Sequence, residues 1–508
     1  MFGSTTRCTK SSRERTEEHE NMAKLDLKLD QLDRAFPEEF TPEQVARAKT
    51  LFFKRLSLAA HRFYGGKLQT VPRVAAFGFN WFNVWYTPGV SAVSTAIRDR
   101  AEASYELSNR GNLVAIVTDS SRVLGDGDVS PPGGLGVMEG KAFLMKMLGG
   151  VDAVPLCMDS RGADGRHDPD RIIEFVQRLQ PSFGAVNLED ISQPECFRVL
   201  DVLRGQCEIP VWHDDAQGTG CVTVAGLLNA LKVAEKELAA ARIVLLGAGA
   251  SNTTIARLLI GAGADPGRMV LFDSRGALSR DRDDIRRDPR FYRKWELCEQ
   301  TNADQFRSIE DALRGADALI ALSKPGPDTV KSDWIRHMGP RAIVFACANP
   351  VPEIYPYAAK QAGALVVATG RGDFPNQVNN SLGFPAILKG ALLVRASKIT
   401  DEMAIAAARS LARFAEKKGL SPEHIIPSME EAGVFPEEAA AVAMQAIQDG
   451  VARRELSREE VCRKTEEGIR EARRVMDLML KEGLIAPPPS DMLESALAAA
   501  ITEVRGGK

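Results

Sequence analysis

Membrane spans, basic tracts and signal sequences are all absent from this chain. No window of its 508 residues approaches the roughly 18 continuous apolar residues that a membrane span requires. Residues 1–21 are polar and carry charges of both signs, so they do not form a secretory signal. There are 65 Lys and Arg against 68 Asp and Glu, whereas polyanion-binding proteins usually show a basic excess. We therefore exclude a membrane and nucleic acid as partners.

Cysteine pairs and short repeats are also missing. The eight cysteines form no C-x-x-C pair, which in a chain of this length is typical of reduced cytosolic thiols. Hydrophobic residues make up 44% and charged residues 26%, as in an ordinary globular protein of several domains. These features predict a soluble cytoplasmic enzyme, with residues 1–22 as a disordered leader.

Apolar runs alternate with stretches of helical spacing, which predicts an α/β fold with mostly parallel sheets. We expect strands at 113–118, 183–188, 209–212, 242–246, 269–272 and 342–346. Residues 219–232 predict a helix that carries the chain from one domain to the next. After Thr400 the chain is rich in Ala, Glu and Arg at helical spacing, so we expect a helical C-terminal segment.

The segment after the strand at 242–246 matches a dinucleotide-binding turn. It reads Gly247-Ala248-Gly249-Ala250-Ser251-Asn252 and precedes a helix predicted at 253–261. Glycines here allow a tight turn and a close approach of the pyrophosphate to the helix N-terminus. Asp273 follows Gly247 by 26 residues, at the end of the next strand, and can accept hydrogen bonds from a ribose. Asn252 replaces the third glycine, and a bare G-x-G also occurs in simple turns, but the combination favours nucleotide binding.

Acidic and amide residues gather where three predicted strands end. These residues are Glu189-Asp190, Asp214-Asp215 and Asn349. Loops at the carboxyl ends of parallel strands line the ligand crevice of an open sheet, although Asp and Asn are also common in turns. Glu189, Asp190 and Asp215 would form an oxygen-only site suited to Mg²⁺ or Mn²⁺. Adjacent carboxylates on a strand face opposite ways, so both reach one ion only if the strand has ended and turned.

Several segments, in one order over residues 61–453, resemble malic enzymes. They are Tyr86-Thr87-Pro88-Gly89-Val90, Val137-Met138-Glu139-Gly140-Lys141, Asn187-Leu188-Glu189-Asp190-Ile191, His213-Asp214-Asp215-Ala216-Gln217-Gly218-Thr219, Ala348-Asn349-Pro350 and Phe374-Pro375-Asn376-Gln377-Val378-Asn379-Asn380. The resemblance implies a catalytic α/β domain at 23–217, a Rossmann-type NAD(P) domain at 218–395 and a helical segment at 396–508. It also implies a homodimer or homotetramer. Residues 455–508 match nothing in the family pattern.

The resemblance implies a role for each matching residue. Tyr86 becomes the proton donor, Lys141 the general base paired with Asp214, and Glu189, Asp190 and Asp215 the metal ligands. Asn349, Asn379 and Asn380 would contact substrate or nicotinamide. The nucleotide would be bound by Gly247, Gly249, Ala250, Ser251, Asn252, Asp273 and Asn349. Arg122 matches an arginine that binds the substrate carboxylate in the eukaryotic branch. Without the resemblance, Lys141 would be a surface lysine, Tyr86 the edge of a core and Arg122 half of a surface ion pair.

The implied reaction is oxidative decarboxylation of L-malate to pyruvate and CO₂. A desolvated lysine has a lowered pKa and can take the C2 hydroxyl proton, and a divalent ion can polarise the C2 oxygen. The same site could instead release lactate and keep its NAD bound, as malolactic enzymes do, or could serve a weakened regulator. Asp273 favours NAD, although Arg275, Arg280 and Arg282 could accommodate the extra phosphate of NADP.

Overall fold

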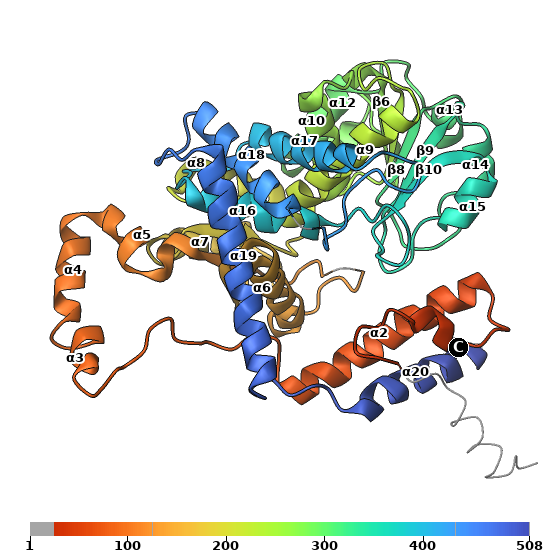
Figure 1. Cartoon of the computed structure of the whole chain (residues 1–508). Coiled ribbons are helices and arrows are strands. Elements are labelled where there is room, and N and C mark those ends of the chain that lie inside the picture. The colour runs from red at the N-terminus through yellow and green to blue at the C-terminus, as the bar shows by residue number, and fades with distance from the viewer. Residues whose placement is uncertain (1–24, 124, 432, 507–508) are drawn as a thin grey trace, which may run out of the picture. The chain divides into compact units, whose positions relative to one another are not determined.

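The structure, a computed structural model, describes residues 25–123, 125–431 and 433–506. The leader predicted at 1–22 lies outside these residues. The described residues form two compact units (Figure 1): one lies within Leu68–Asp477, and the other joins residues 25–67 to residues 478–506. The α/β fold with parallel sheets is confirmed, whereas the predicted domain boundaries stay predictions. Among the described residues, no helix combines the length and apolarity needed to cross a bilayer.

The first sheet of the larger unit has four parallel strands in the order β2-β1-β3-β4. Its strands are β1 (Leu113–Thr118), β2 (Asp152–Cys157), β3 (Ala185–Leu188) and β4 (Val211–His213). Val114 and Ile116 of β1 pack into one core, while Ala115 and Val117 pack into another. Burial on both faces explains the continuous apolar run of this strand. The helices of this part of the chain are α3 (Trp81–Trp85), α4 (Val90–Asp99), α5 (Ser104–Leu107), α6 (Leu135–Gly149), α7 (Pro169–Leu179) and α8 (Glu195–Gln206).

The second sheet has six strands in the order β10-β9-β8-β5-β6-β7, of which only β7 is antiparallel to its neighbour. They are β5 (Ile243–Leu246), β6 (Met269–Asp273), β7 (Gly276–Ala277), β8 (Ala318–Ala321), β9 (Ala342–Ala346) and β10 (Ala364–Thr369). Helix α9 (Thr219–Val233) connects the two sheets, as expected. The helices that follow are α10 (Ala250–Ala262), α11 (Asp283–Arg286), α12 (Tyr292–Gln300), α13 (Ile309–Leu313), α14 (Ser332–Arg336), α15 (Pro356–Gln361) and α16 (Phe384–Leu393).

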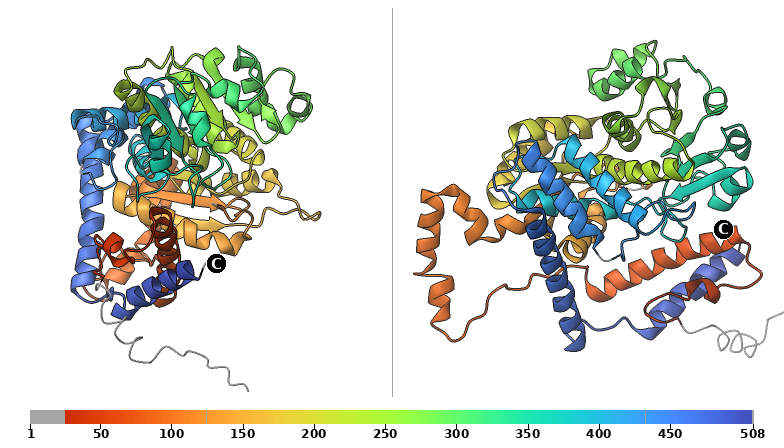
Figure 2. Two further views of the ribbon diagram at one scale, coloured as in Figure 1. Left: turned by 90° about the vertical axis from the view of Figure 1, so that its right-hand side faces the viewer. Right: turned by 45° about the horizontal axis from the view of Figure 1, so that its top comes forward.

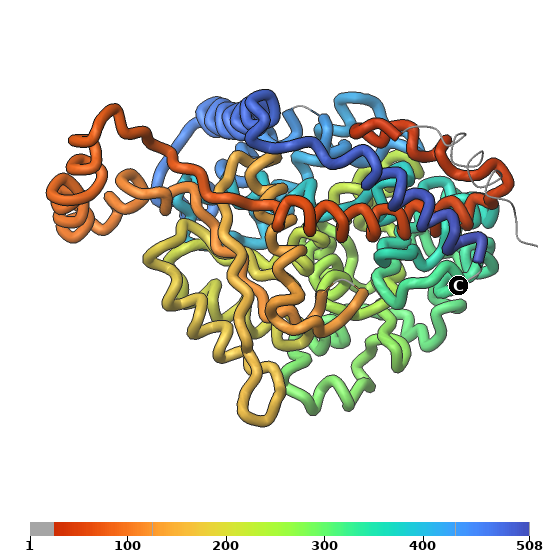
Figure 3. The backbone as a smooth tube through the Cα atoms, turned by 90° about the horizontal axis from the view of Figure 1, so that it is seen from below, coloured from red at the N-terminus to blue at the C-terminus, as the bar shows by residue number. Residues whose placement is uncertain are grey.

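The C-terminal segment is helical, as the sequence predicts. It contains α17 (Asp401–Lys417), α18 (Val434–Gln448), α19 (Arg458–Lys481) and α20 (Ser490–Arg505). Buried alanines on α17 and α18, such as Ala408 and Ala439, let these helices approach closely and join the core beneath α16. The described start of the chain and α20 form the smaller unit, where α20 runs alongside α2 (Pro42–Tyr64) (Figure 3) and Leu497 and Phe52 share a small core.

Candidate active site

The candidate site lies where β3 and β4 end, because Glu189 and Asp190 follow β3 directly and Asp214 and Asp215 follow β4. One carboxylate oxygen from each of Glu189, Asp190 and Asp215 lies within 4.8 Å of the others. Asp190 has a φ of 53°, in the left-handed region, so the backbone turns immediately after the strand. That turn brings the adjacent carboxylates of Glu189 and Asp190 to one point. Two adjacent carboxylates can bind one ion only if the strand has ended and turned, as it does here.

Lys141 is buried on the inner side of α6, so it is not a surface lysine. Its Nζ lies 3.0 Å from Glu189 Oε1 and donates a hydrogen bond to Asp214 Oδ2. The ring of Phe384 covers the ammonium group at 4.6 Å. Asp214 is fully buried and accepts a second hydrogen bond from Trp212 Nε1 at 3.1 Å. The predicted pair of Lys141 and Asp214 is therefore formed.

The charges around Lys141 correct the expectation of a lowered pKa. Burial by itself lowers the pKa of Lys141, but the facing carboxylates of Asp214 and Glu189 outweigh burial and raise the pKa above its ordinary value. Burial also raises the pKa of the Glu189 carboxyl, and the nearby Asp215 adds to this rise. With no further cation, the lysine is held in its protonated form.

The donor set fits a hard divalent cation. Four carboxylates lie where β3 and β4 end, and Lys141 pairs with two of them, Glu189 and Asp214. His213 offers no second charge, because burial lowers the pKa of its imidazole. A group of carboxylate oxygens without cysteine is the chemistry that Mg²⁺ and Mn²⁺ prefer.

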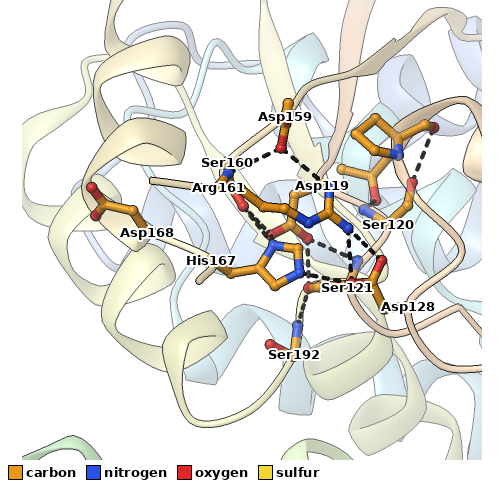
Figure 4. A network of polar contacts seen from close by, with 12 residues as sticks. Asp119, Ser120, Ser121, Asp128, Asp159, Ser160, Arg161, His167, Asp168 and Ser192 are labelled. Atoms are coloured by element: carbon orange, nitrogen blue, oxygen red, sulfur yellow. Dashed lines mark hydrogen bonds and ion pairs between the residues drawn. The ribbon is translucent and has the colours of Figure 1, made fainter. Parts of the chain in front are cut away.

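A polar network joins the neighbouring loops beside these carboxylates (Figure 4). Asp119, which follows β1, is buried and accepts hydrogen bonds from Ser121 and Ser160, and His167 Nδ1 lies 3.1 Å from its Oδ2. His167 Nε2 lies 3.1 Å from Asp128 Oδ2, so both ring nitrogens face carboxylates. The sequence analysis did not single out this network, because its members come from three separate loops.

Arg122, the candidate substrate arginine, belongs to the same loop. Its backbone N–H donates to the carbonyl of Asp190 at 3.0 Å, which places the residue beside the carboxylate group. Its guanidinium makes no ion pair with any residue in 25–123, 125–431 or 433–506 and is exposed. The structure therefore does not support a surface ion pair as the reason for this arginine.

The dinucleotide turn has the predicted strand–turn–helix form, with α10 beginning at Ala250. Gly247 has a φ of 95°, and a Cβ there would collide with the carbonyl of Leu322. Asn252 is buried in place of the third glycine, and its Nδ2 donates to the carbonyls of Leu246 at 3.0 Å and Gly247 at 2.8 Å. Ser251 Oγ donates to the carbonyl of Asp215 at 2.9 Å, so the turn contacts the carboxylate group directly.

Asp273 lies at a cavity of about 220 Å³ beside this turn. Arg282 donates to both of its oxygens, at 3.0 and 2.9 Å, and Lys294 Nζ lies 3.4 Å away. Arg275 also lines the cavity, whereas Arg280 donates to the carbonyl of Glu299. The lining thus carries three cations against the two carboxylates of Asp273 and Asp284.

The candidate asparagines lie on two loops of the second sheet. Asn349 follows β9 and is exposed. Its loop is fixed by the buried Glu353, which accepts from the N–H groups of Ala348 at 3.0 Å and Ser323 at 2.7 Å. Asn379 Oδ1 accepts from the Ser381 hydroxyl at 2.7 Å and so shapes its own loop. Asn380 lies near Asp214, since a Cβ on Gly218 would meet both side chains.

Tyr86 is the one predicted catalytic residue that the structure does not bring to the carboxylates. Its side chain is 73% exposed. Figures 1 and 2 show α3 and α4, which flank it, standing away from the sheets of the larger unit. Phe77 and Phe79 in the same segment are 78% and 83% exposed, so Tyr86 is not the edge of a core. Large exposed apolar patches are uncommon on monomeric soluble proteins and often mark interaction sites.

Comparisons with known proteins agree with this geometry. Residues 79–204 match the family described as "Malic enzyme, N-terminal domain", and residues 216–448 match "Malic enzyme, NAD binding domain". The "Bifunctional malic/malolactic enzyme" of Bacillus subtilis (strain 168) is 42% identical over 80% of this chain and 97% of its own length. An "NAD-dependent malic enzyme" of Geobacillus stearothermophilus is 40% identical over 77% of this chain and 79% of its own. The crystal structure of Entamoeba histolytica malic enzyme superposes with a TM-score of 0.93 and is 60% identical, covering 95% of this chain and all of that one.

Proposed function

This chain belongs to the malic enzyme family, and from that premise we propose how its residues carry out the oxidative decarboxylation of malate. The reaction converts L-malate to pyruvate and CO₂ with reduction of NAD or NADP. The observation that carries the proposal is the buried Lys141, held between Glu189 and Asp214 beside the three clustered carboxylates. A buried lysine next to a divalent-ion site matches a reaction that removes a proton from a hydroxyl on a chelating substrate.

Lys141 is the proposed general base for the C2 hydroxyl proton, and Asp214 orients it. Glu189, Asp190 and Asp215 would hold Mg²⁺ or Mn²⁺. A divalent ion held there would offset the carboxylate charge that keeps Lys141 protonated and would polarise the C2 oxygen of malate. Arg122 would bind a carboxylate of malate, and Asn349, Asn379 and Asn380 would position the substrate and the nicotinamide.

We propose that a second copy of the chain supplies Tyr86. The exposed aromatic segment at 77–86 needs an apolar partner, and helix α6, which carries Lys141, offers an exposed apolar surface. Leu135 and Phe143 form this surface, at 44% and 42% exposure. Covering it with the partner's aromatic segment would bring the partner's Tyr86 towards the site, where its hydroxyl would protonate C3. The predicted homo-oligomer would then be a requirement of catalysis.

For the nucleotide we propose NAD, as Asp273 suggests, with NADP accepted as a second cofactor. Asp273 alone would repel a 2′-phosphate. However, its carboxylate is already paired with Arg282 and approached by Lys294, and the cavity carries one more cation than anion. This charge balance weakens the repulsion of a 2′-phosphate and supports the use of both NAD and NADP.

The malolactic reaction is a second candidate, because the Bacillus subtilis relative is named a bifunctional malic/malolactic enzyme. It differs only in whether reduced nicotinamide leaves before pyruvate is reduced to lactate. The assay that tests both incubates the purified protein with L-malate, Mn²⁺ and NAD⁺ or NADP⁺, and follows reduced nicotinamide, pyruvate and lactate. We expect pyruvate and reduced nicotinamide in equal amounts. Lactate without net reduced nicotinamide would favour the malolactic reaction, and no product with either nucleotide across several metals would reject both.

A further inference from the structure

The carboxylate of Asp119 is saturated by donors from two loops. Oδ1 accepts from the Ser121 backbone N–H at 3.1 Å and from the Ser121 hydroxyl at 2.6 Å. Oδ2 accepts from the Ser160 hydroxyl at 2.7 Å and lies 3.1 Å from His167 Nδ1. The side chain is 1% exposed. Asp119 is therefore a fixed acceptor at the end of β1, and its oxygens have no role as ligands.

From Asp119 a path of hydrogen bonds leads through Ser121 to Ser192 (Figure 4), and the adjacent Arg122 extends it to Asp190. The Ser121 hydroxyl gives its proton to Asp119, which leaves its oxygen to accept the N–H of Ser192 at 2.9 Å. The next residue, Arg122, donates its N–H to the carbonyl of Asp190 at 3.0 Å. The Ser121-Arg122 pair thus holds Asp190 and Ser192, two residues on the far loop.

Asp190 needs such support because of its backbone conformation. Its φ of 53° lies in the left-handed region, which residues other than glycine enter at a cost in free energy. The N–H of Asp190 donates to Asp215 Oδ2 at 2.7 Å, so the conformation also joins two of the three clustered carboxylates. A shift at Asp190 would move both.

We propose that Asp119 is a positioning residue that sets the backbone of Asp190, through Ser121 and Arg122, and thereby the affinity of the three-carboxylate group for a divalent cation. The inference rests on the metal site of the proposed function. It assigns no ligand beyond Glu189, Asp190 and Asp215. Residues that orient metal ligands typically change affinity by about 10- to 100-fold when they are mutated.

The test measures Mn²⁺ binding to the full-length protein without substrate, from the electron paramagnetic resonance signal of free Mn²⁺. We expect Asp119→Asn to weaken Mn²⁺ binding about tenfold or more, because an amide would offer N–H groups to donors. Ser121→Ala, which keeps the buried carboxylate, is expected to weaken it by a smaller factor. The matched control is Ser120→Ala, which removes a buried hydroxyl of the same loop that donates to the Pro131 carbonyl at 3.2 Å. Ser120→Ala is expected to leave Mn²⁺ affinity unchanged, even if it lowers the melting temperature as much as Ser121→Ala does.

A further variant separates this inference from the metal site itself. Asp190→Asn removes a proposed ligand and is expected to abolish Mn²⁺ binding. If wild type and Asp190→Asn bind Mn²⁺ equally, or neither binds it, the proposed metal site is wrong and the inference fails with it. If Asp190→Asn abolishes binding while Asp119→Asn and Ser121→Ala match Ser120→Ala, only the positioning role is overturned. If Asp119→Asn fails to fold, the comparison of Mn²⁺ affinity between Ser121→Ala and Ser120→Ala decides whether the positioning role holds.

Discussion

Lys141 shows how single residues at this site depend on their neighbours' charge. An ammonium group beside two carboxylates keeps its proton, so we expect the proposed base to form only when positive charge reaches the same carboxylates. The residue is thus ready for proton transfer only in the loaded site. This dependence is a property of the tertiary contact, since Glu189 and Asp214 lie 48 and 73 positions from Lys141 in the sequence.

The general-base role predicts a selective loss of turnover. Lys141→Ala is expected to lower kcat by about a hundredfold or more, the usual size of a general-base effect. Mn²⁺ affinity is expected to hold, because the three carboxylates remain. Steady-state kinetics and Mn²⁺ titration measure the two quantities. Lys146→Ala is the matched control, since Lys146 lies on the same helix but pairs with Asp152 at 2.8 Å. Near-normal kcat in Lys141→Ala would contradict the assignment.

The charge balance at Asp273 predicts a change in nucleotide preference. Lys294→Ala removes one of three cations from the cavity lining and should weaken NADP⁺ more than NAD⁺. A charge interaction of about 1 kcal/mol lowers kcat/KM for NADP⁺ roughly fivefold. The ratio of kcat/KM for the two nucleotides is the measurement. Arg280→Ala serves as the control, because Arg280 donates to the Glu299 carbonyl and lies outside the lining. An equal effect of both variants on the ratio would count against a role of Lys294 in selection.

At the scale of elements, α6 and α19 meet at two glycines. Gly150, which ends α6, has a φ of 62°, and a Cβ there would lie 2.6 Å from the backbone carbonyl carbon of Gly468 in α19. The close approach places the buried Lys389 of α16 nearby, where its Nζ donates to Asn112 Oδ1 at 3.0 Å. Three helices are therefore packed around one backbone contact and one buried cation.

The backbone contact predicts that Gly150→Ala is costly. The matched variant is Gly165→Ala, because Gly165 has a similar φ of 76° but no atom within 4 Å of the added Cβ. Both variants carry the same conformational cost, so the difference between them measures packing alone. Gly150→Ala is expected to be less stable than Gly165→Ala by about 1–3 kcal/mol, the usual cost of overpacking. Denaturant midpoints give the comparison, and equal midpoints would show that α19 can move aside.

The buried cation predicts a pH-dependent contribution to stability. Burial lowers the pKa of Lys389 to about 8, from an ordinary 10.5. Between these values the unfolded chain binds more protons than the folded one, so the Lys389 contribution to stability rises with pH in this window. Lys389→Met is therefore expected to gain up to about 3 kcal/mol over wild type at pH 7, less the cost of the lost hydrogen bond to Asn112. Unfolding midpoints of both proteins from pH 7 to 10.5 test this, and a gain that does not shrink as pH rises would refute it.

At the scale of the whole molecule, the proposed supply of Tyr86 by a second chain can be tested with mixed dimers. Co-expression of differently tagged Lys141→Ala and Tyr86→Phe chains distinguishes a shared site from a self-contained one. If Tyr86 acts across the interface, a mixed dimer has one site with both defects and one with neither. The purified mixed dimer is then expected to recover about half of wild-type activity, by this arithmetic and the two-fold symmetry of most dimers. Mixed dimers no more active than the parents would place Tyr86 and Lys141 in one chain.

The sequence by itself determined the fold class and most strands, because their apolar runs and the turns after them are local features. Strands at 113–118, 242–246 and 342–346 are formed as expected. Strand β2 was not predicted, since Pro155 interrupts its pattern and is tolerated only because β2 lies at a sheet edge. The sequence predicts that residues 455–508 are helical but not where they pack, because the partner of α20 is a helix more than 400 residues earlier in the chain.

Some features of the candidate site could likewise be predicted from the sequence, whereas others depend on tertiary contacts. Residue types at strand ends identified Glu189, Asp190 and Asp215, because parallel strands deliver their ends to one edge of a sheet. Only the tertiary structure decided the protonation of Lys141, the pairing of Asp273 and the exposure of Tyr86. Each depends on distances between segments far apart in the sequence. Electrostatic energies vary with those distances and with burial, and neither can be read from residue order.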